Sequence, residues 1–240
     1  MVGVLILAIE TATGCGGVAL TRGVGESGKL LAEYTLQPEV THSRRLLGSV
    51  AAMMAAVGID WSELAAVAVS QGPGSFTGLR IGMAAAKGIA IAAGIPLLAV
   101  PTLDGLALQT TTTDLPICCL LDARKQQVYA AFYRYEAERC RRTSPFLVLG
   151  PEELAHQIHE PTLVIGPGVQ ACQSLFAAHP LMRSNPVGFL HPRAAAIGFC
   201  GARQLAEEAT SEAEEIVPLY VRASEAELSL RGMDGRVRGA

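Results

Sequence analysis

The sequence predicts an α/β protein with two lobes, and three observations support this prediction. Half of the 240 residues are hydrophobic and 17% are charged, which provides enough apolar surface for a sizeable core. Strand-like and helix-like segments alternate along the chain. The string Gly-Pro-Gly occurs twice, at 72–74 and 166–168, each time between a strand-like and a helix-like segment. We therefore expect an N-terminal lobe at 1–102, a C-terminal lobe at 103–225 and a frayed tail at 226–240.

The first half is expected to follow the order β-β-β-α-β-α-β. Short runs rich in Val, Ile and Leu are separated by turn residues, which is typical of strands. Between them, apolar residues such as Leu46, Val50 and Met53 recur at helical spacing. The expected strands are Val4–Ile9, Gly17–Thr21, Leu30–Leu36, Ala65–Ser70 and Leu97–Val100. One expected helix is bounded by Thr41 and Gly58, and another follows the loop at 71–80 and ends near Gly94.

The second half is expected to repeat this mixture of strands and helices. The basic run Arg139–Arg142 is interpreted as a solvated loop, because charge runs usually lie on the surface. The expected strands are Leu115–Leu121, Gln127–Tyr135, Phe146–Leu149 and Thr162–Ile165, and the expected helices are Leu103–Gln109, two that follow Pro151 and Gly168, and Pro192–Glu208.

Composition restricts the possible functions and the compartment. The net charge of −3 argues against a protein that grips tRNA by itself, because such a protein usually carries a basic face. Six cysteines without a C-x-x-C pair fit a reducing cytoplasm. The apolar segments at 2–9 and 81–100 are predicted to be a buried strand and a core helix with its strand. We therefore expect a cytoplasmic protein without a membrane segment.

Two loops are candidates for ligand binding. A Gly-rich loop at 72–80 precedes a helix, where free backbone N–H groups favour an anion. It fits neither the Walker A, the G-x-G-x-x-G nor the nucleophile-elbow pattern, so a tight packing turn is an equally good interpretation. The loop at 10–16 places a carboxylate and two hydroxyls after a strand, which suits a phosphate or simply a hairpin. The candidate cofactor-binding residues are Glu10, Thr11, Thr13, Gly72, Gly74 and Ser75.

Several strings together resemble a known family. The most specific is Gly-Pro-Gly-Ser-Phe-Thr-Gly-Leu-Arg at 72–80, and others are Ala-Ile-Glu-Thr-Ala-Thr at 8–13, His-Ser-Arg-Arg-Leu-Leu at 42–47 and Pro-Leu-Tyr-Val-Arg at 218–222. On these strings the chain resembles the TsaB (YeaZ) family, strongly over residues 4–135 and more weakly beyond.

The resemblance implies an actin/Hsp70-like (ASKHA, RNase H-like) fold and a role in a complex. The complex forms threonylcarbamoyladenosine (t6A) at adenosine 37 of tRNA. The implied partners are a TsaD-type catalytic paralogue, a TsaE-type ATPase, and a second copy of the chain when TsaD is absent. Contact with tRNA is expected only through the complex, and ATP or ADP is expected, if at all, at the interface with the partners.

One departure from the catalytic paralogue implies a subunit without catalytic or metal-binding residues. The paralogue carries two metal-binding histidines after the strand that here ends at Val100, where this chain has Pro101–Leu106 without histidine. Asp104 alone does not make a metal site, because such sites take about three protein ligands. The alternatives are a stand-alone ASKHA enzyme, either a phosphotransferase using acids such as Glu10 and Asp122 or an M22-type metallopeptidase, and a general chaperone-like interaction protein.

The family also implies a helical bundle shared with the partner. Helices at 50–56 and 82–90 are rich in small residues, which allow backbones to approach, and in methionine, which adapts to uneven surfaces. Ordinary packing within the lobe explains the same pattern equally well. The candidate interface residues are Met53, Met54, Met83, Ala85, Ala86 and Ile89.

Overall fold

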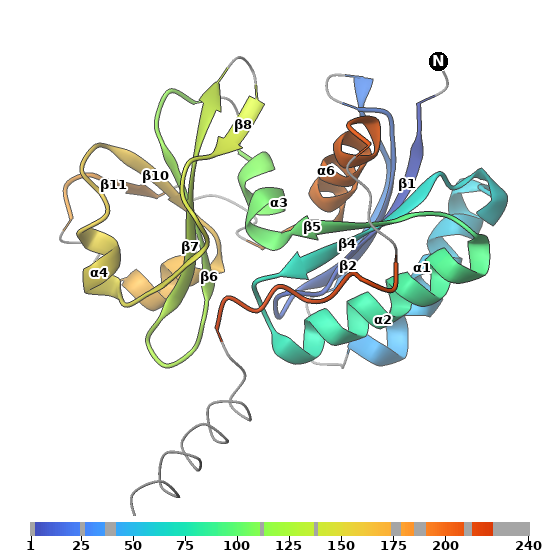
Figure 1. Cartoon of the computed structure of the whole chain (residues 1–240), viewed down its shortest axis with the longest axis horizontal. Helices are drawn as coiled ribbons and strands as arrows, with labels where there is room; N and C mark the ends of the chain where they lie inside the picture. The colour runs from blue at the N-terminus through green and yellow to red at the C-terminus, as the bar shows by residue number, and fades with distance from the viewer. Residues whose placement is uncertain are drawn as a thin grey trace, which may run out of the picture.

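Two mixed β-sheets, one in each lobe, organise the chain (Figure 1). The computed structural model describes residues 3–24, 27–36, 42–110, 113–136, 139–173, 179–184, 191–208 and 213–222. The predicted tail at 226–240 and the cap at Thr41 lie outside these residues.

The first sheet has the strand order β3-β2-β1-β4-β5. Its first three strands form an antiparallel meander, and β4 and β5 run parallel to β1. All residues of β1 are buried, because both faces of the sheet are covered by helices. The bounds are β1 Leu5–Glu10, β2 Gly16–Arg22, β3 Lys29–Leu36, β4 Ala66–Gly72 and β5 Leu97–Pro101.

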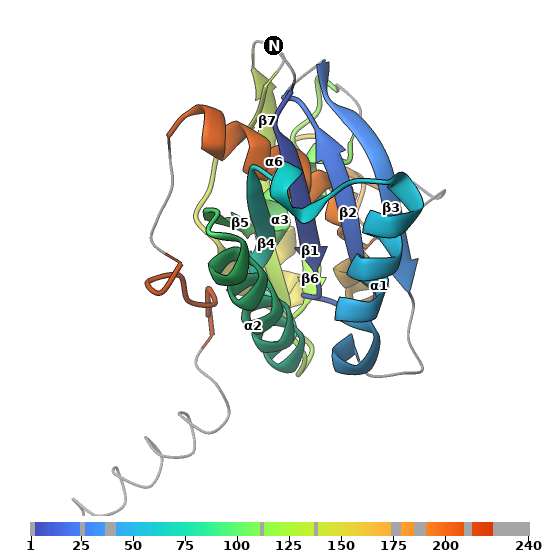
Figure 2. The same cartoon turned by 90° about the vertical axis from the view of Figure 1, so that its right-hand side faces the viewer.

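Helices cover the two faces of this sheet separately. The helices α1 (His42–Val57) and α2 (Phe76–Ala93) pack on one face, and α6 (Ala194–Ala206) packs on the other (Figures 1 and 2). Successive strand residues point to opposite faces. Accordingly Leu7 packs in the cluster of α1 and α2, and Ala8 packs in that of α6. The helix α2 is long and apolar enough to cross a membrane, but in this fold it lies against the sheet.

The second sheet has the order β11-β10-β6-β7-β8, with β9 paired to the other end of β7. The helix α3 (Thr102–Leu108) follows the first sheet directly and packs against β6, β7 and α6. The remaining bounds are β6 Ile117–Asp122, β7 Val128–Glu136, β8 Arg139–Arg142, β9 Leu147–Leu149, α4 Pro151–Ala155, β10 Thr162–Ile165, β11 Met182–Ser184 and the 3-10 helices η2 Trp61–Glu63 and η3 Pro167–Cys172.

The basic run at 139–142 is the edge strand β8, so the prediction of a loop was wrong. It pairs antiparallel with β7. Arg139 and Arg141 lie beside Glu207 and Glu136, and Arg142 lies beside Asp104. Charged side chains are common on edge strands, because they discourage pairing with another chain. A charge run therefore does not exclude a strand at a sheet edge.

The chain returns to the first lobe after completing the second sheet. The helix α6 and the segment 213–222 both fall within 103–225, yet both pack on the first lobe. We call residues 213–222 the strap. Ile216 of the strap is buried in the core beneath α2, and Leu219 N–H donates to Gln71 O at 2.8 Å. In Figure 1 the strap, drawn in red, runs beneath the first sheet toward the second lobe.

Candidate functional site

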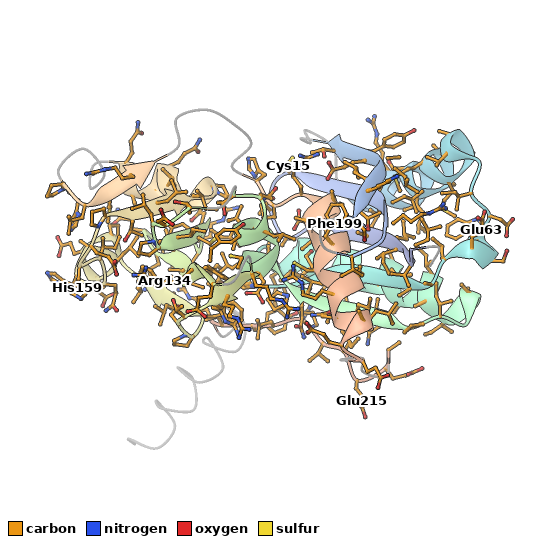
Figure 3. The ribbon with its side chains drawn as sticks, turned by 90° about the horizontal axis from the view of Figure 1, so that it is seen from above. Cys15, Glu63, Arg134, His159, Phe199 and Glu215 are labelled. Carbon is orange, nitrogen blue, oxygen red and sulfur yellow. The ribbon has the colours of Figure 1, made fainter. Side chains whose placement is uncertain are left out.

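A cleft of about 830 Å³ opens between the two lobes. The first lobe contributes the turn after β1 and the loop that begins α2, and the second lobe contributes the β6–β7 turn and the start of η3. Figure 3 shows Cys15, from the turn after β1, at this junction. The lining residues are Ala12, Thr13, Gly14, Gly74, Ser75, Phe76, Thr77, Arg80, Leu121, Asp122, Ala123, Arg124, Lys125, Tyr129, Pro167, Gln170, His191, Tyr220 and Arg222.

The two candidate ligand loops of the first lobe interlock. The N–H of Ser75 donates to Ala12 O at 2.6 Å, and the hydroxyl of Thr11 donates to Gly78 O at 2.8 Å. A Cβ atom at Gly74 or Gly78 would lie well inside 3.0 Å of the backbone of Ala12 or Thr11. These glycines therefore serve close packing, which is one of the two interpretations that the sequence left open.

The candidate hydroxyl groups in these loops have protein partners. Ser75 is the N-cap of α2, and its hydroxyl accepts from Gly78 N at 3.3 Å. The hydroxyl of Thr13 donates to Cys15 O at 2.9 Å. The hydroxyl groups of these side chains therefore help to hold the loops in shape.

Glu10 is fully buried below the cleft. Its Oε1 accepts from Ala12 N at 2.7 Å, whereas Oε2 has no hydrogen-bond partner among the described residues. Burial raises the pKa of Glu10 to about 8, although the hydrogen bond from Ala12 and the neighbouring Ser70 hydroxyl oppose the shift. The carboxyl group is therefore mostly protonated at neutral pH and is a poor ligand for a cation.

The second lobe contributes a strained turn. Arg124, Lys125 and Gln126 have φ values of 62°, 52° and 58°, in the left-handed region that side chains disfavour. The turn is closed by Gln127 N–H donating to Arg124 O at 3.0 Å, and Asp122 Oδ1 accepts from Arg124 N at 2.7 Å. Three consecutive residues in this region persist only where surrounding contacts hold them, and such sites are often functional.

The strap forms one wall of the cleft. Tyr220 stacks on Phe76 with ring centroids 5.0 Å apart, and Arg80 lies over Phe76 at 3.7 Å and donates to Tyr220 Oη at 3.2 Å. Arg222 reaches the second lobe, where it donates to Ala123 O at 3.2 Å. The strings at 72–80 and 218–222, far apart in sequence, therefore meet at the cleft.

Three arginines, Arg80, Arg124 and Arg222, line the cleft. Among the described residues, no ion pair involves Arg80, Arg124 or Arg222. The sequence analysis did not identify these three as site residues. Their positions in the sequence could have identified them, because Arg80 and Arg222 lie in the strings at 72–80 and 218–222 and Arg124 lies in the turn between β6 and β7. Elsewhere the described arginine–carboxylate pairs are Arg134–Glu160, Arg139–Glu207, Arg141–Glu136, Arg142–Asp104 and Arg193–Glu33.

The segment after β5 is turned away from this cleft. Thr102 and Leu106 are buried. Asp104 accepts from Tyr133 Oη at 2.7 Å and lies 3.6 Å from Arg142, and burial raises its pKa. The described residues include no group of three His, Cys, Asp or Glu side chains that could hold a metal ion. Asp104 is therefore a structural partner of Tyr133 and Arg142.

An apolar groove of about 430 Å³ lies on the outer face of α1 and α2. It contains Ala85 and Ile89, two of the candidate interface residues, together with Trp61 and Leu47, which the sequence analysis missed. The sequence did contain a signal for Leu47, which is an apolar residue at a position outside the buried face of its helix. The full lining is Leu47, Trp61, Ala84, Ala85, Gly88, Ile89, Ala92 and Ala93.

Four other candidate interface residues belong to the core. Met53, Met54, Met83 and Ala86 are 0–4% exposed and pack against the first sheet. Their assignment to a partner surface was wrong for this structure, because helical periodicity does not reveal which face is covered. Arg at Met53 would therefore disrupt folding and not only pairing.

Comparisons with known proteins agree on one family. The family model for "TsaD: tRNA N6-adenosine threonylcarbamoyltransferase" matches residues 29–230. The chain is 32% identical to the tRNA threonylcarbamoyladenosine biosynthesis protein TsaB of Escherichia coli, over 95% of this chain and 99% of that protein. It is 29% identical to TsaB of Bacillus subtilis, over 92% and 96% of the two chains.

A solved structure supports the same conclusion. The structure of YeaZ from Pseudomonas aeruginosa superposes with a TM-score of 0.74 and 26% identity, and covers 91% of this chain and 100% of that one. The predicted actin/Hsp70-like, RNase H-like α/β fold is thereby confirmed.

Proposed function

This chain belongs to the TsaB (YeaZ) family of tRNA threonylcarbamoyladenosine biosynthesis proteins, and we propose that it is the non-catalytic partner of a TsaD-type threonylcarbamoyltransferase. In this role it binds and activates the transferase that forms t6A at position 37 of tRNA in the cytoplasm. A TsaE-type ATPase joins the same complex.

The observation that carries the proposal is the apolar groove on α1 and α2. The groove is lined by small residues, and Leu47 and Trp61 at its edges are 58% and 40% exposed. Exposed apolar surface of this kind marks interaction sites. Small side chains such as Ala84 and Gly88 allow a partner helix to approach closely. A paralogue with the same fold presents a matching pair of helices, and a second copy of this chain occupies the groove when the paralogue is absent.

The groove is tested with Ala84→Arg. Ala84 is exposed on α2, so the variant is expected to fold normally while its guanidinium blocks the approach of a partner helix. Co-purification with the TsaD-type paralogue is expected to be lost, and t6A formation on tRNA by the mixed proteins is expected to fall with it. Ala206→Arg is the matched control, because Ala206 is also an exposed helical alanine but lies on α6, outside the groove.

Two results would contradict the proposal. Full pairing by Ala84→Arg would exclude the groove as the interface. Formation of t6A by the paralogue without this chain, at the same rate, would exclude the activating role. Turnover of ATP by the purified chain alone would instead favour the stand-alone enzyme.

A further inference from the structure

We infer that the cleft binds single-stranded RNA, holding backbone phosphates with Arg80, Arg124 and Arg222 and stacking a base on Phe76 and Tyr220. The inference rests on the proposed function, since it assigns this subunit a direct contact with the RNA substrate. It concerns the cleft between the lobes, which is separate from the groove on α1 and α2.

The charges in the cleft favour an anionic ligand. The chain has a net charge of −3, yet three guanidinium groups line one cleft without an ion pair among the described residues. The carboxylate that faces them is Asp122, and its Oδ1 accepts from Arg124 N. Guanidinium groups bind phosphate through two parallel hydrogen bonds, which makes arginine suited to this ligand.

The aromatic side chains favour a nucleotide over a simple anion. Phe76 and Tyr220 are 36% and 40% exposed and stack on each other, and Arg80 lies flat on Phe76. Cations combined with aromatic platforms are typical of proteins that bind single-stranded nucleic acid, because every base has a face that stacks. Tyr129, half-buried, adds a third aromatic ring to the lining.

The loops favour an RNA strand over a magnesium-bound nucleoside triphosphate. A triphosphate needs free hydroxyls, backbone N–H groups and carboxylates for the metal. Here the hydroxyls of Thr11, Thr13 and Ser75 have protein partners. Glu10 is buried beneath the loop and is mostly protonated at neutral pH. The accessible side chains of the cleft are mainly arginines and aromatic rings from three segments of the chain, together with Thr77 and Asp122, and they come from both lobes.

The test is the binding of a fluorescein-labelled oligoadenylate of about ten nucleotides, a length within the usual range of site sizes, about 4–16 nucleotides. Fluorescence anisotropy is measured at several salt concentrations with the full chain, alone and paired with the TsaD-type paralogue. Each phosphate contact with single-stranded nucleic acid contributes about −0.7 to the slope of log K against log salt. Arg124→Gln and Arg222→Gln are each expected to weaken binding and to make the slope shallower by about 0.7.

Control variants separate the cleft from general surface charge. Arg134→Gln and Arg141→Gln remove one charge each from arginines paired with Glu160 and Glu136, and are expected to bind like the original chain. Phe76→Leu keeps an apolar side chain but removes the ring, so it is expected to weaken binding with the salt slope unchanged. Thermal unfolding of every variant verifies the fold.

Several outcomes would overturn the inference. These are equal binding by the cleft variants and the original chain, equal losses in the two control variants, or no binding in either state of the chain. Magnesium–ATP that displaces the probe better than unlabelled oligoadenylate would assign the cleft to a free nucleotide, and equal displacement by polyglutamate would assign it to an acidic protein. Pairing with the paralogue is measured on the same variants, so a failure of RNA binding is distinguished from a failure of the proposed function.

Discussion

At the scale of single residues, the buried carboxyl group of Glu10 links the first strand to the cleft. Its pKa is about 8 in the folded chain and near 4.5 when exposed. Between these values the unfolded chain loses the proton while the folded chain keeps it. Stability therefore falls as pH rises through this window, by at most about 1.4 kcal/mol per pH unit.

Glu10→Gln tests this linkage. The amide does not ionise, so the variant is expected to lose the decline in stability between about pH 5 and pH 8 and to be the more stable protein at pH 8. Urea unfolding at a series of pH values measures the difference. Glu152→Gln, on the exposed surface of α4, is the control. Parallel pH curves for Glu10→Gln and the original chain would contradict the assigned burial effect.

The sequence identified Glu10 as an acid at a strand end but did not reveal its state. Its pKa depends on its complete burial in the folded chain, where the loop that carries Ser75 bonds to Ala12, two residues after Glu10. Ser75 itself was recognised, with two possible uses, and its hydroxyl proves to be a cap. Contacts between residues more than 60 positions apart, such as Ser75 and Ala12, decide which atoms of a loop remain free to bind a ligand. The periodicity of the sequence carries no information about such contacts.

At the scale of single elements, α2 contains glycines with opposite roles. A Cβ at Gly78 would collide with the backbone of Thr11, whereas a Cβ at Gly88 would meet no described residue within 4 Å. Gly78→Ala is therefore expected to destabilise the chain by about 3 kcal/mol or more. Gly88→Ala is expected to stabilise it by up to about 1 kcal/mol, through helix propensity. Chemical denaturation of both variants checks the signs, and a stabilising Gly78→Ala would show that the loops do not interlock.

The turn between β6 and β7 allows a second test of local strain. Gln126 has a φ of 58°, which costs about 1 kcal/mol for a residue with a side chain. Gln126→Gly is expected to recover part of this energy and to raise the melting temperature. Gln127→Gly is the matched control, because Gln127 is not among the residues with positive φ and gains nothing from glycine. A lower melting temperature for Gln126→Gly would mean that the side chain holds the turn.

Elements with a strong local pattern were predicted well, and those without one were not. The stop at Gly94, where φ is 64°, is encoded locally, so the end of α2 was predicted closely, whereas its start at Phe76 lies inside the string that was predicted as a loop. The strand β8 was missed because four consecutive residues rich in arginine lack alternating polarity. The strand β11 has three residues, too few for any period to appear.

At the scale of the whole molecule, the strap connects the two lobes. Ile216 anchors it in the first lobe, and Arg222 bonds to the second. Ile216→Ala is expected to lower the free energy of unfolding by about 2–5 kcal/mol, because Ile216 is buried. Val217→Ala, at a position 62% exposed, is expected to change it by less than about 0.5 kcal/mol. Similar urea midpoints for the two variants would mean that the strap is not part of the core.

The helix α6 was predicted from its sequence pattern, but the sheet against which it packs could not be predicted from the sequence. Gly198 and Gly201 let the helix approach Thr21 and Ala68 of the first sheet. Small residues in a helix indicate that it makes a close contact, but they do not reveal which of the two sheets it contacts. The division of the chain at residue 102 therefore describes the order of the elements better than it describes how they pack.

The packing of α6, a late element of the sequence, against the first sheet has a consequence for the nascent chain. One face of the first sheet, including Ile6, Ala8 and Leu98, is covered by a helix that begins at Ala194. At about 5–20 residues per second, the ribosome delivers that helix roughly 10–40 s after the first strand. The first lobe cannot be completed during this interval, so its uncovered apolar face must be kept from aggregating, by a chaperone or by the ribosome surface, until α6 has been synthesised.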